Sequence, residues 1–233
     1  MSLDPGLGTI AAIMVPMPYK RERQFFTNYR RSLNKRPDLA SDIVESISKV
    51  LTAYNSSVWE NRFIIGGVVE QIIGSSARAM GLRVANAGKQ NQGYDLKVGK
   101  RGPVGISVKG QFNSKGSGNI NLVNVRKKQG KLSQDEAVQR WSSATMFVIA
   151  GIGIGYADNE QVPHLVQSTS DAVQIKVTGL RKWWEEKQNQ CWLIKLDVPL
   201  KPKTPTLRVA SDTVANYILA DFPTLKKYQE DEI

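Results

Sequence analysis

Cysteine and histidine are almost absent from this sequence of 233 residues, which contains one residue of each type, Cys191 and His164. A single cysteine excludes an internal disulfide framework. A single histidine excludes every site that needs two or more histidines, which removes zinc fingers of the Cys₂His₂ type, HNH-type nucleases and hydrolases built on a histidine relay. Long apolar runs are absent as well, since the stretch 9–15 is too short to span a bilayer and is followed by Pro16 and Pro18. We therefore expect a soluble, cytoplasmic protein that does not enter a membrane.

Acidic residues are scarce relative to basic ones, with 21 Asp and Glu against 32 Lys and Arg, a formal net charge of +11. The excess is concentrated in two segments. Residues 19–36 contain seven basic residues and one acid, and residues 96–132 contain nine basic residues and no acid. Because the charge is local, it favours a polyanionic partner, with nucleic acid first and acidic proteins or anionic membranes as alternatives.

The hydrophobic pattern predicts a chain of mixed α/β (α+β) class. Helical spacing of apolar residues occurs over 37–54 and over 64–80, where Gly81 ends the helix. Strands are expected at 82–86, 94–98 and 104–110, and the last two form a hairpin. The elements expected further along are a loop over 113–130 with a short strand at 120–123, a helix over 133–141, one central strand over 145–157, strands at 173–177 and 191–198, a helix over 180–188 and a helical region from 211. We expect residues 1–36 to be a basic N-terminal arm and residues 37–233 to be a single domain.

The predicted hairpin gathers polar side chains on one face. If its turn pairs Val98 with Val104, Asp95 lies across from Ser107 and diagonal to Lys109, within about 7–8 Å between Cβ atoms. One face of the hairpin then presents an acid, a hydroxyl and an ammonium group. The other face is predicted to be apolar and to consist of Tyr94, Leu96, Val98, Val104, Ile106 and Val108.

Such a cluster beside an acid-free basic segment suits metal-assisted hydrolysis of phosphodiesters. Asp95 offers a hard oxygen ligand for Mg²⁺, and the backbone carbonyl of Val108 offers a second. Lys109 can orient or deprotonate the attacking water and offset the charge on phosphorus. A second carboxylate is usually needed, and Glu70 is its natural source. It lies on the helix over 64–80 and shares a face with the small residues Gly66, Gly74 and Ala77, which would let that face approach the strands.

This order of residues resembles the PD-(D/E)XK nuclease superfamily, which includes most restriction endonucleases. The resemblance covers roughly residues 64–110 and consists of the helical Glu70, Asp95 at the start of a hairpin and Ser107-Val108-Lys109 fourteen residues later. It implies a restriction-endonuclease-like core, about 64–157, with a mixed central β-sheet flanked by helices. It also implies Asp95 and Glu70 as metal-holding acids, Lys109 as the catalytic lysine and Mg²⁺ as the cofactor, with Mn²⁺ able to substitute.

The chain departs from the superfamily pattern at two positions. The superfamily pattern has a proline directly before the aspartate, and this chain has Tyr94 there. The pattern also has an acid two residues before the lysine, and this chain has Ser107 there. A subgroup of restriction enzymes has the same Ser-Val-Lys and takes its missing carboxylate from a downstream helix. Glu136 is the candidate for this migrated acid here, although Glu70 alone can also complete the site.

The resemblance implies a Mg²⁺-dependent, sequence-specific endonuclease of double-stranded DNA, of type II restriction class. We expect it to act as a homodimer, with a tetramer as the alternative, since two-fold protein symmetry matches palindromic DNA. A structure-specific repair, recombination or transposition nuclease of the same fold and a non-catalytic DNA-binding protein are the alternatives, and RNA stays open as the substrate. The residues expected to contact DNA are Lys20, Arg21, Arg23, Arg30, Arg31, Asn113, Lys115, Asn119, Asn121, Arg126, Lys127 and Lys128.

Overall fold

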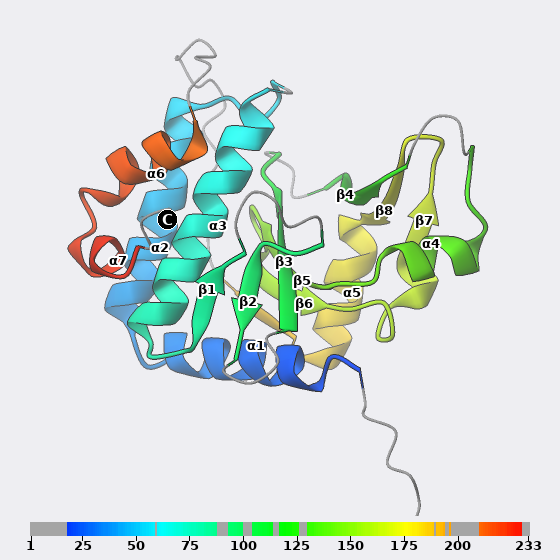
Figure 1. Cartoon of the computed structure of the whole chain (residues 1–233), viewed down its shortest axis with the longest axis horizontal. Helices are drawn as coiled ribbons and strands as arrows, with labels where there is room; N and C mark the ends of the chain where they lie inside the picture. Colours follow the sequence, from blue (N-terminus) through cyan, green and yellow to red (C-terminus); the bar gives the residue numbers. More distant parts are fainter. Residues whose placement is uncertain are drawn as a thin grey trace, which may run out of the picture.

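The structure is a computed structural model that describes residues 18–58, 60–87, 93–99, 104–113, 117–125, 130–188, 190–193, 196 and 210–229. Along the described chain a group of helices comes first, strands with interspersed helices follow, and two helices come last (Figure 1). In chain order they are α1 (Lys20–Leu33), α2 (Pro37–Ala53), α3 (Asn61–Ala79), β1 (Val84–Asn86), β2 (Leu96–Val98), β3 (Val104–Gln111), β4 (Asn119–Asn124), α4 (Gln134–Arg140), β5 (Ala144–Ile149), β6 (Gly153–Ala157), the 3₁₀-helix η2 (Pro163–Leu165), β7 (Val166–Ser168), β8 (Ala172–Lys176), α5 (Val177–Lys187), β9 (Cys191–Leu193), α6 (Ser211–Leu219) and α7 (Pro223–Lys227). None of these described helices is long and apolar enough to cross a membrane.

A mixed sheet of six strands in the order β1-β2-β3-β5-β6-β9 forms the centre of the molecule, and a second sheet has the order β4-β8-β7. In the central sheet β3 and β5 are parallel, while the other described pairs are antiparallel. Helices lie on both sides of it, with α1, α2 and α3 on one side and α5 on the other (Figure 1). The mixed α/β class and the mixed central sheet flanked by helices are therefore confirmed.

Two hydrophobic cores lie on the opposite faces of the central sheet. Val108 and Met146 belong to the first core, together with apolar residues of α1, α2, α3 and α6. Phe147 and Ile149, which alternate with Met146 along β5, belong to the second core with α4, α5 and the second sheet. Because neighbouring strand residues point to opposite faces, Ser107 and Lys109 share the side of the second core.

The apolar run 145–157 is not one strand, as its sequence predicts, but two antiparallel strands, β5 and β6. The chain turns at Gly151, whose φ of +73° favours glycine. Gly155 on β6 is in close contact with Trp184 of α5, because a Cβ atom at this position would lie 2.3 Å from the indole ring. The glycines of this run thus serve a turn and close packing.

The basic segment 19–36, expected as an arm, forms helix α1 over Lys20–Leu33. Its apolar residues Phe26, Tyr29 and Leu33 recur at helical spacing and are buried in the first core. The Tyr29 hydroxyl also shares a hydrogen bond of 2.8 Å with the Ser76 hydroxyl on α3. The basic side chains of this segment are therefore carried by a helix that belongs to the folded domain.

Candidate active site

The hairpin of β2 and β3 has the register that the sequence predicts. Val98 pairs with Val104 and Leu96 with Ile106. The pairing continues one residue before β2, where the Asp95 N–H donates a 3.0 Å hydrogen bond to the Ile106 carbonyl. This register brings Asp95 beside Ser107.

Asp95 is held through one of its two carboxylate oxygens. Oδ2 accepts hydrogen bonds from Ser107 Oγ at 2.9 Å and from the Val108 N–H at 2.6 Å. The Lys109 Nζ lies 3.8 Å from the same oxygen. Within the described part of the chain, the other oxygen, Oδ1, accepts no hydrogen bond. The side chains of Asp95 and Lys109 are 23% and 30% exposed, so both groups are accessible to a substrate.

Tyr94 does not lie on the apolar face of the hairpin, where strict alternation predicts it. The strand β2 begins at Leu96, so alternation does not extend back to Tyr94. Its ring instead lies over Gly105, where a Cβ atom would be 2.1 Å from the ring carbons. Glycine at position 105 thus makes room for the residue that precedes the aspartate.

Helix α3 brings Glu70 within electrostatic reach of Asp95 and Lys109. One turn beyond it, Gly74 packs closely on the strands, since a Cβ atom there would lie 3.4 Å from Leu96 Cδ2. Burial raises the pKa of the Glu70 carboxyl to about 8, and the negative charge of Asp95 adds to this rise while Lys109 opposes it. Glu70, Asp95 and Lys109 are therefore close enough to influence one another's charge.

A third carboxylate, Asp212, approaches from α6 and was not predicted from the sequence. Its charge also raises the pKa of Glu70. The first turn of α6 lies against α3, because a Cβ atom at Gly67 would be 2.5 Å from Ser211 Oγ. The sequence signals only that a helical region begins at Ser211, and no local pattern links it to Glu70.

The chemistry of these groups fits a magnesium ion. Asp95 and Glu70 supply hard carboxylate oxygens, and a bound dication would offset both the burial and the repulsion from Asp95 that raise the pKa of Glu70. The Val108 carbonyl points to the same side of β3 as its N–H, which faces Asp95. Among the described residues no three Asp, Glu, His or Cys side chains converge closely enough to hold a metal alone. The carbonyl and a substrate phosphate would therefore have to complete the coordination.

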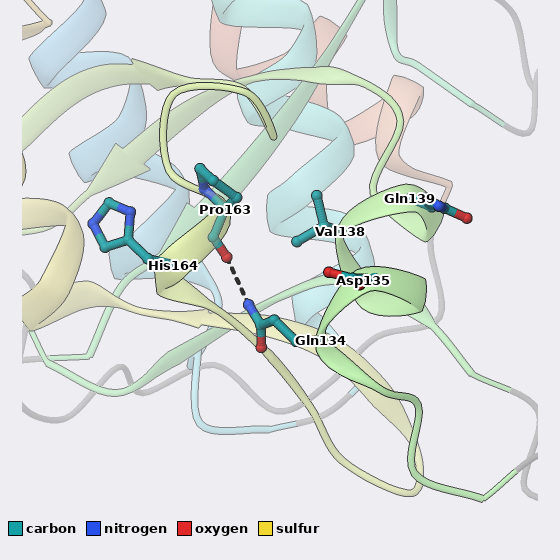
Figure 2. Close-up of a pocket in the computed structure, with 6 residues that line it drawn as sticks. All are labelled: Gln134, Asp135, Val138, Gln139, Pro163 and His164. Carbon is teal, nitrogen blue, oxygen red and sulfur yellow. Dashed lines mark hydrogen bonds between the residues drawn. The ribbon is translucent and has the colours of Figure 1, made fainter.

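Glu136, the candidate for a migrated acid, serves as part of a helix cap. Its carboxylate accepts hydrogen bonds from the Ser133 N–H at 2.8 Å and from Ser133 Oγ at 2.7 Å, which lower its pKa. The helix that it begins, α4, packs against β7 of the second sheet. Figure 2 shows a pocket beside this helix, lined by Gln134, Asp135, Val138, Gln139, Pro163 and His164. None of the carboxylates that surround Lys109 lines that pocket.

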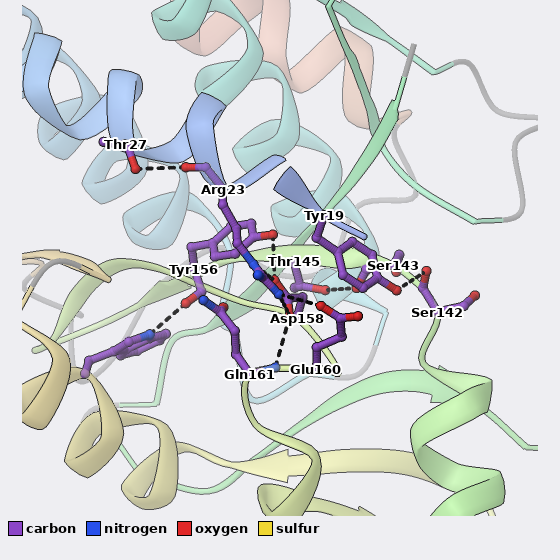
Figure 3. Close-up of polar contacts among 11 residues, drawn as sticks. Tyr19, Arg23, Thr27, Ser142, Ser143, Thr145, Tyr156, Asp158, Glu160 and Gln161 are labelled. Atoms are coloured by element: carbon purple, nitrogen blue, oxygen red, sulfur yellow. Dashed lines mark hydrogen bonds and ion pairs between the residues drawn. The ribbon is translucent and has the colours of Figure 1, made fainter. Parts of the chain in front are cut away.

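The residues expected to contact DNA lie in different settings. Lys20, Arg21 and Arg31 are exposed on α1, whereas Arg23 forms ion pairs with Asp158 and Glu160 (Figure 3). The Arg30 Nη1 donates to the Gln188 carbonyl at 3.2 Å. The Asn113 side chain exchanges hydrogen bonds with the backbone of Ser117, while Asn119 and Asn121 are exposed on β4. Lys115, Arg126, Lys127 and Lys128 lie outside the described residues.

The raised pKa of Glu70 predicts a loss of stability toward alkaline pH. The folded protein keeps a proton on Glu70 up to about pH 8, whereas the unfolded chain releases it near its ordinary pKa of 4.5. The stabilisation from this group is therefore complete below pH 4.5 and is lost as the pH rises through about 8. Without divalent cations, the free energy of unfolding in urea should decrease across this range in the wild type.

The variant Glu70→Gln should lack this part of the decrease, because its amide does not titrate. Added Mg²⁺ at about pH 8.5 should stabilise the wild type more than the variant, since only the wild type has a carboxylate at position 70 that can bind the ion. Equal pH slopes in the two proteins would contradict the assignment of a buried, titrating Glu70.

Comparison of this chain with protein-family models, with curated proteins and with solved structures finds no match. Any assignment of function must therefore rest on the geometry and chemistry of the site itself.

Proposed function

We propose that this protein is a Mg²⁺-dependent endonuclease that cuts double-stranded DNA at a specific sequence, as type II restriction enzymes do. The observation that carries the proposal is the arrangement around Asp95. One oxygen is fixed by Ser107 and Val108, and Lys109 lies 3.8 Å away. Glu70 on α3 lies within electrostatic reach of both Asp95 and Lys109, so two acids and an ammonium influence one another near the start of the hairpin.

Each residue has a defined task in this proposal. Asp95, Glu70 and the Val108 carbonyl would hold Mg²⁺, which when bound makes water a stronger nucleophile and offsets charge on the scissile phosphate. Ser107 replaces an acid of the superfamily pattern and orients Asp95 instead of binding metal, because its hydroxyl donates to Oδ2. Lys109 would orient the attacking water, accept its proton as the neutral amine, and as the resulting ammonium stabilise the charge on phosphorus.

The excess of positive charge supports DNA as the substrate. The segment 96–132, which contains β3 and β4, has nine basic residues and no acid. Lys20, Arg21 and Arg31 add exposed charges on α1. Phosphate contacts from such groups supply much of the affinity of proteins for DNA. A homodimer would place two active sites on the two strands of a symmetric sequence.

The proposal is tested by incubating the purified protein with several plasmid and phage DNAs in Mg²⁺ or Mn²⁺, beside the variant Asp95→Ala. We expect discrete, reproducible fragments with the wild type and none with the variant. Random cleavage that is also lost in the variant would overturn sequence specificity and favour a repair or recombination nuclease. Absence of cleavage by the wild type, with equal DNA binding by both proteins, would overturn the nuclease assignment.

A further inference from the structure

The strands β4 and β8, an antiparallel pair at one edge of the three-stranded second sheet, carry polar side chains on one face, and this pair is called the β4–β8 ribbon below. Asn121 pairs with Gln174, and Asn119 pairs with Lys176. The neighbouring strand β7 extends the first row, because Gln167 pairs with Gln174 from the other side. Three amide side chains therefore lie in one row across three strands, and a lysine and a fourth amide form the next row.

The other face of the ribbon is buried. Ile120, Leu122, Val173 and Ile175 all belong to the second hydrophobic core. Since side chains alternate between the two faces, the amides point away from this core, and Asn119, Asn121, Gln167 and Lys176 are exposed. Within the described part of the chain, the side chains of Asn121, Gln167 and Gln174 make no hydrogen bond. Their donors and acceptors are thus available to a ligand.

The ribbon begins next to the strand that carries Lys109. Gln111 follows Lys109 by two residues and shares its side of β3, at a distance of about 7 Å along the strand. The Gln111 Nε2 donates a 3.0 Å hydrogen bond to the Asn119 carbonyl, which ties the start of β4 to the end of β3. A further step of about 7 Å along β4 reaches the row of Asn121 and Gln174. The amide face thus starts beside the candidate active site and runs away from it.

The surface has the chemistry of a reader of base edges. An amide can donate and accept at once, which matches N6 and N7 of adenine, and the major groove admits a two-stranded β-ribbon. The sequences of β4, β7 and β8 contain no aspartate or glutamate that would repel phosphates. Lys176 adds a positive charge to the same face.

We infer that the β4–β8 ribbon enters the major groove of duplex DNA and that Asn119, Asn121 and Gln174 read base edges there. This inference rests on the proposed function, because it names the surface that would give the nuclease its sequence specificity. It predicts A·T pairs within the recognition sequence, on one side of the cleaved phosphate.

The test is selection of bound DNA from a pool of duplexes with a randomised centre, in Ca²⁺ to prevent cleavage. The proteins compared are the wild type, the double variant Asn121→Ala/Gln174→Ala, and Asn216→Ala as a matched control. Asn216 is an exposed amide on α6, at the other end of the molecule from the ribbon (Figure 1). We expect the wild type and Asn216→Ala to select one motif. The double variant should lose discrimination at one or two A·T positions, by about 10- to 100-fold for each bidentate contact.

The possible results test the ribbon inference and the nuclease proposal separately. An unchanged motif in the double variant overturns the ribbon inference, even if the wild type cleaves DNA in an Asp95-dependent way. A motif that depends on the amides in a protein that cleaves no DNA overturns the nuclease proposal and supports the ribbon. Replacing adenine by 7-deazaadenine in the selected duplex should weaken wild-type binding, and unchanged binding would show that the ribbon does not read N7 in the major groove.

Discussion

Replacing Lys109 by alanine is expected to reduce the rate of DNA cleavage by about 10²- to 10⁴-fold, the usual contribution of a positioned proton-transfer group. The reason is geometric, because its ammonium lies 3.8 Å from the carboxylate of Asp95, where the attacking water and the scissile phosphate would meet. DNA binding in Ca²⁺ should change only a few-fold, since one phosphate contact among many is lost. The measurement is the single-turnover cleavage rate of a duplex that contains one mapped site.

Lys97 provides the matched control for this variant. It lies on the same hairpin, opposite Gly105, and contributes the same charge to the surface. Lys97→Ala should cleave within about tenfold of the wild type, because no contact places Lys97 at Asp95. If both alanine variants lose activity equally, Lys109 acts through general charge alone. If Lys109→Ala cleaves at the wild-type rate, the lysine has no catalytic role.

The part of the site that sequence could predict is the part made by local interactions. The turn after Val98 and the alternation of polar and apolar residues determine which residue faces which across a hairpin, and the register of Asp95 and Ser107 follows from them. The same reasoning fails at Tyr94, since alternation holds only where a strand is regular and β2 begins at Leu96. The position of Tyr94 depends on Gly105, which has no side chain and so leaves room for the tyrosine ring.

Two local features could have been read from the sequence but were obscured by stronger signals. The basic residues of 19–36 suggested an arm, although Phe25, Phe26, Tyr29 and Leu33 have the spacing of a helix with a buried face. In the run 145–157, continuous apolarity suggested one strand. Gly151 marks the turn that divides it, because glycine adopts a positive φ at little cost.

The approach of distant segments could not be predicted, because it depends on how the helices are arranged around the sheet. Glu70 and Asp212 belong to helices that are far apart in the sequence, and only the packing of α6 on α3 brings their charges together. The ion pair of Arg23 with Asp158 likewise joins α1 to the segment after β6. No periodicity in either segment identifies the partner in the other.

Asp158→Ala should be the most destabilising of the substitutions considered, by about 3–5 kcal/mol. The Asp158 side chain has no exposed surface, and its carboxylate accepts from Arg23 Nε at 2.8 Å and Nη2 at 2.9 Å. It also accepts from the Tyr156 hydroxyl at 3.0 Å, so alanine would leave both a guanidinium and a hydroxyl without their partner (Figure 3). Unfolding in urea, monitored by circular dichroism, measures the loss as a lower midpoint at unchanged slope.

Glu160 provides a control that distinguishes the loss of a buried ion pair from the loss of a charge in general. It binds the same Arg23 guanidinium, but its side chain is 41% exposed. Glu160→Ala should cost no more than about 1 kcal/mol. The double variant Arg23→Met/Asp158→Leu should regain much of the stability lost in Asp158→Ala, because it removes the unpaired guanidinium as well. Recovery would show that the network positions α1 and its exposed cations at a cost in desolvation. If the double variant is as unstable as Asp158→Ala, the loss comes instead from the other contacts of Asp158.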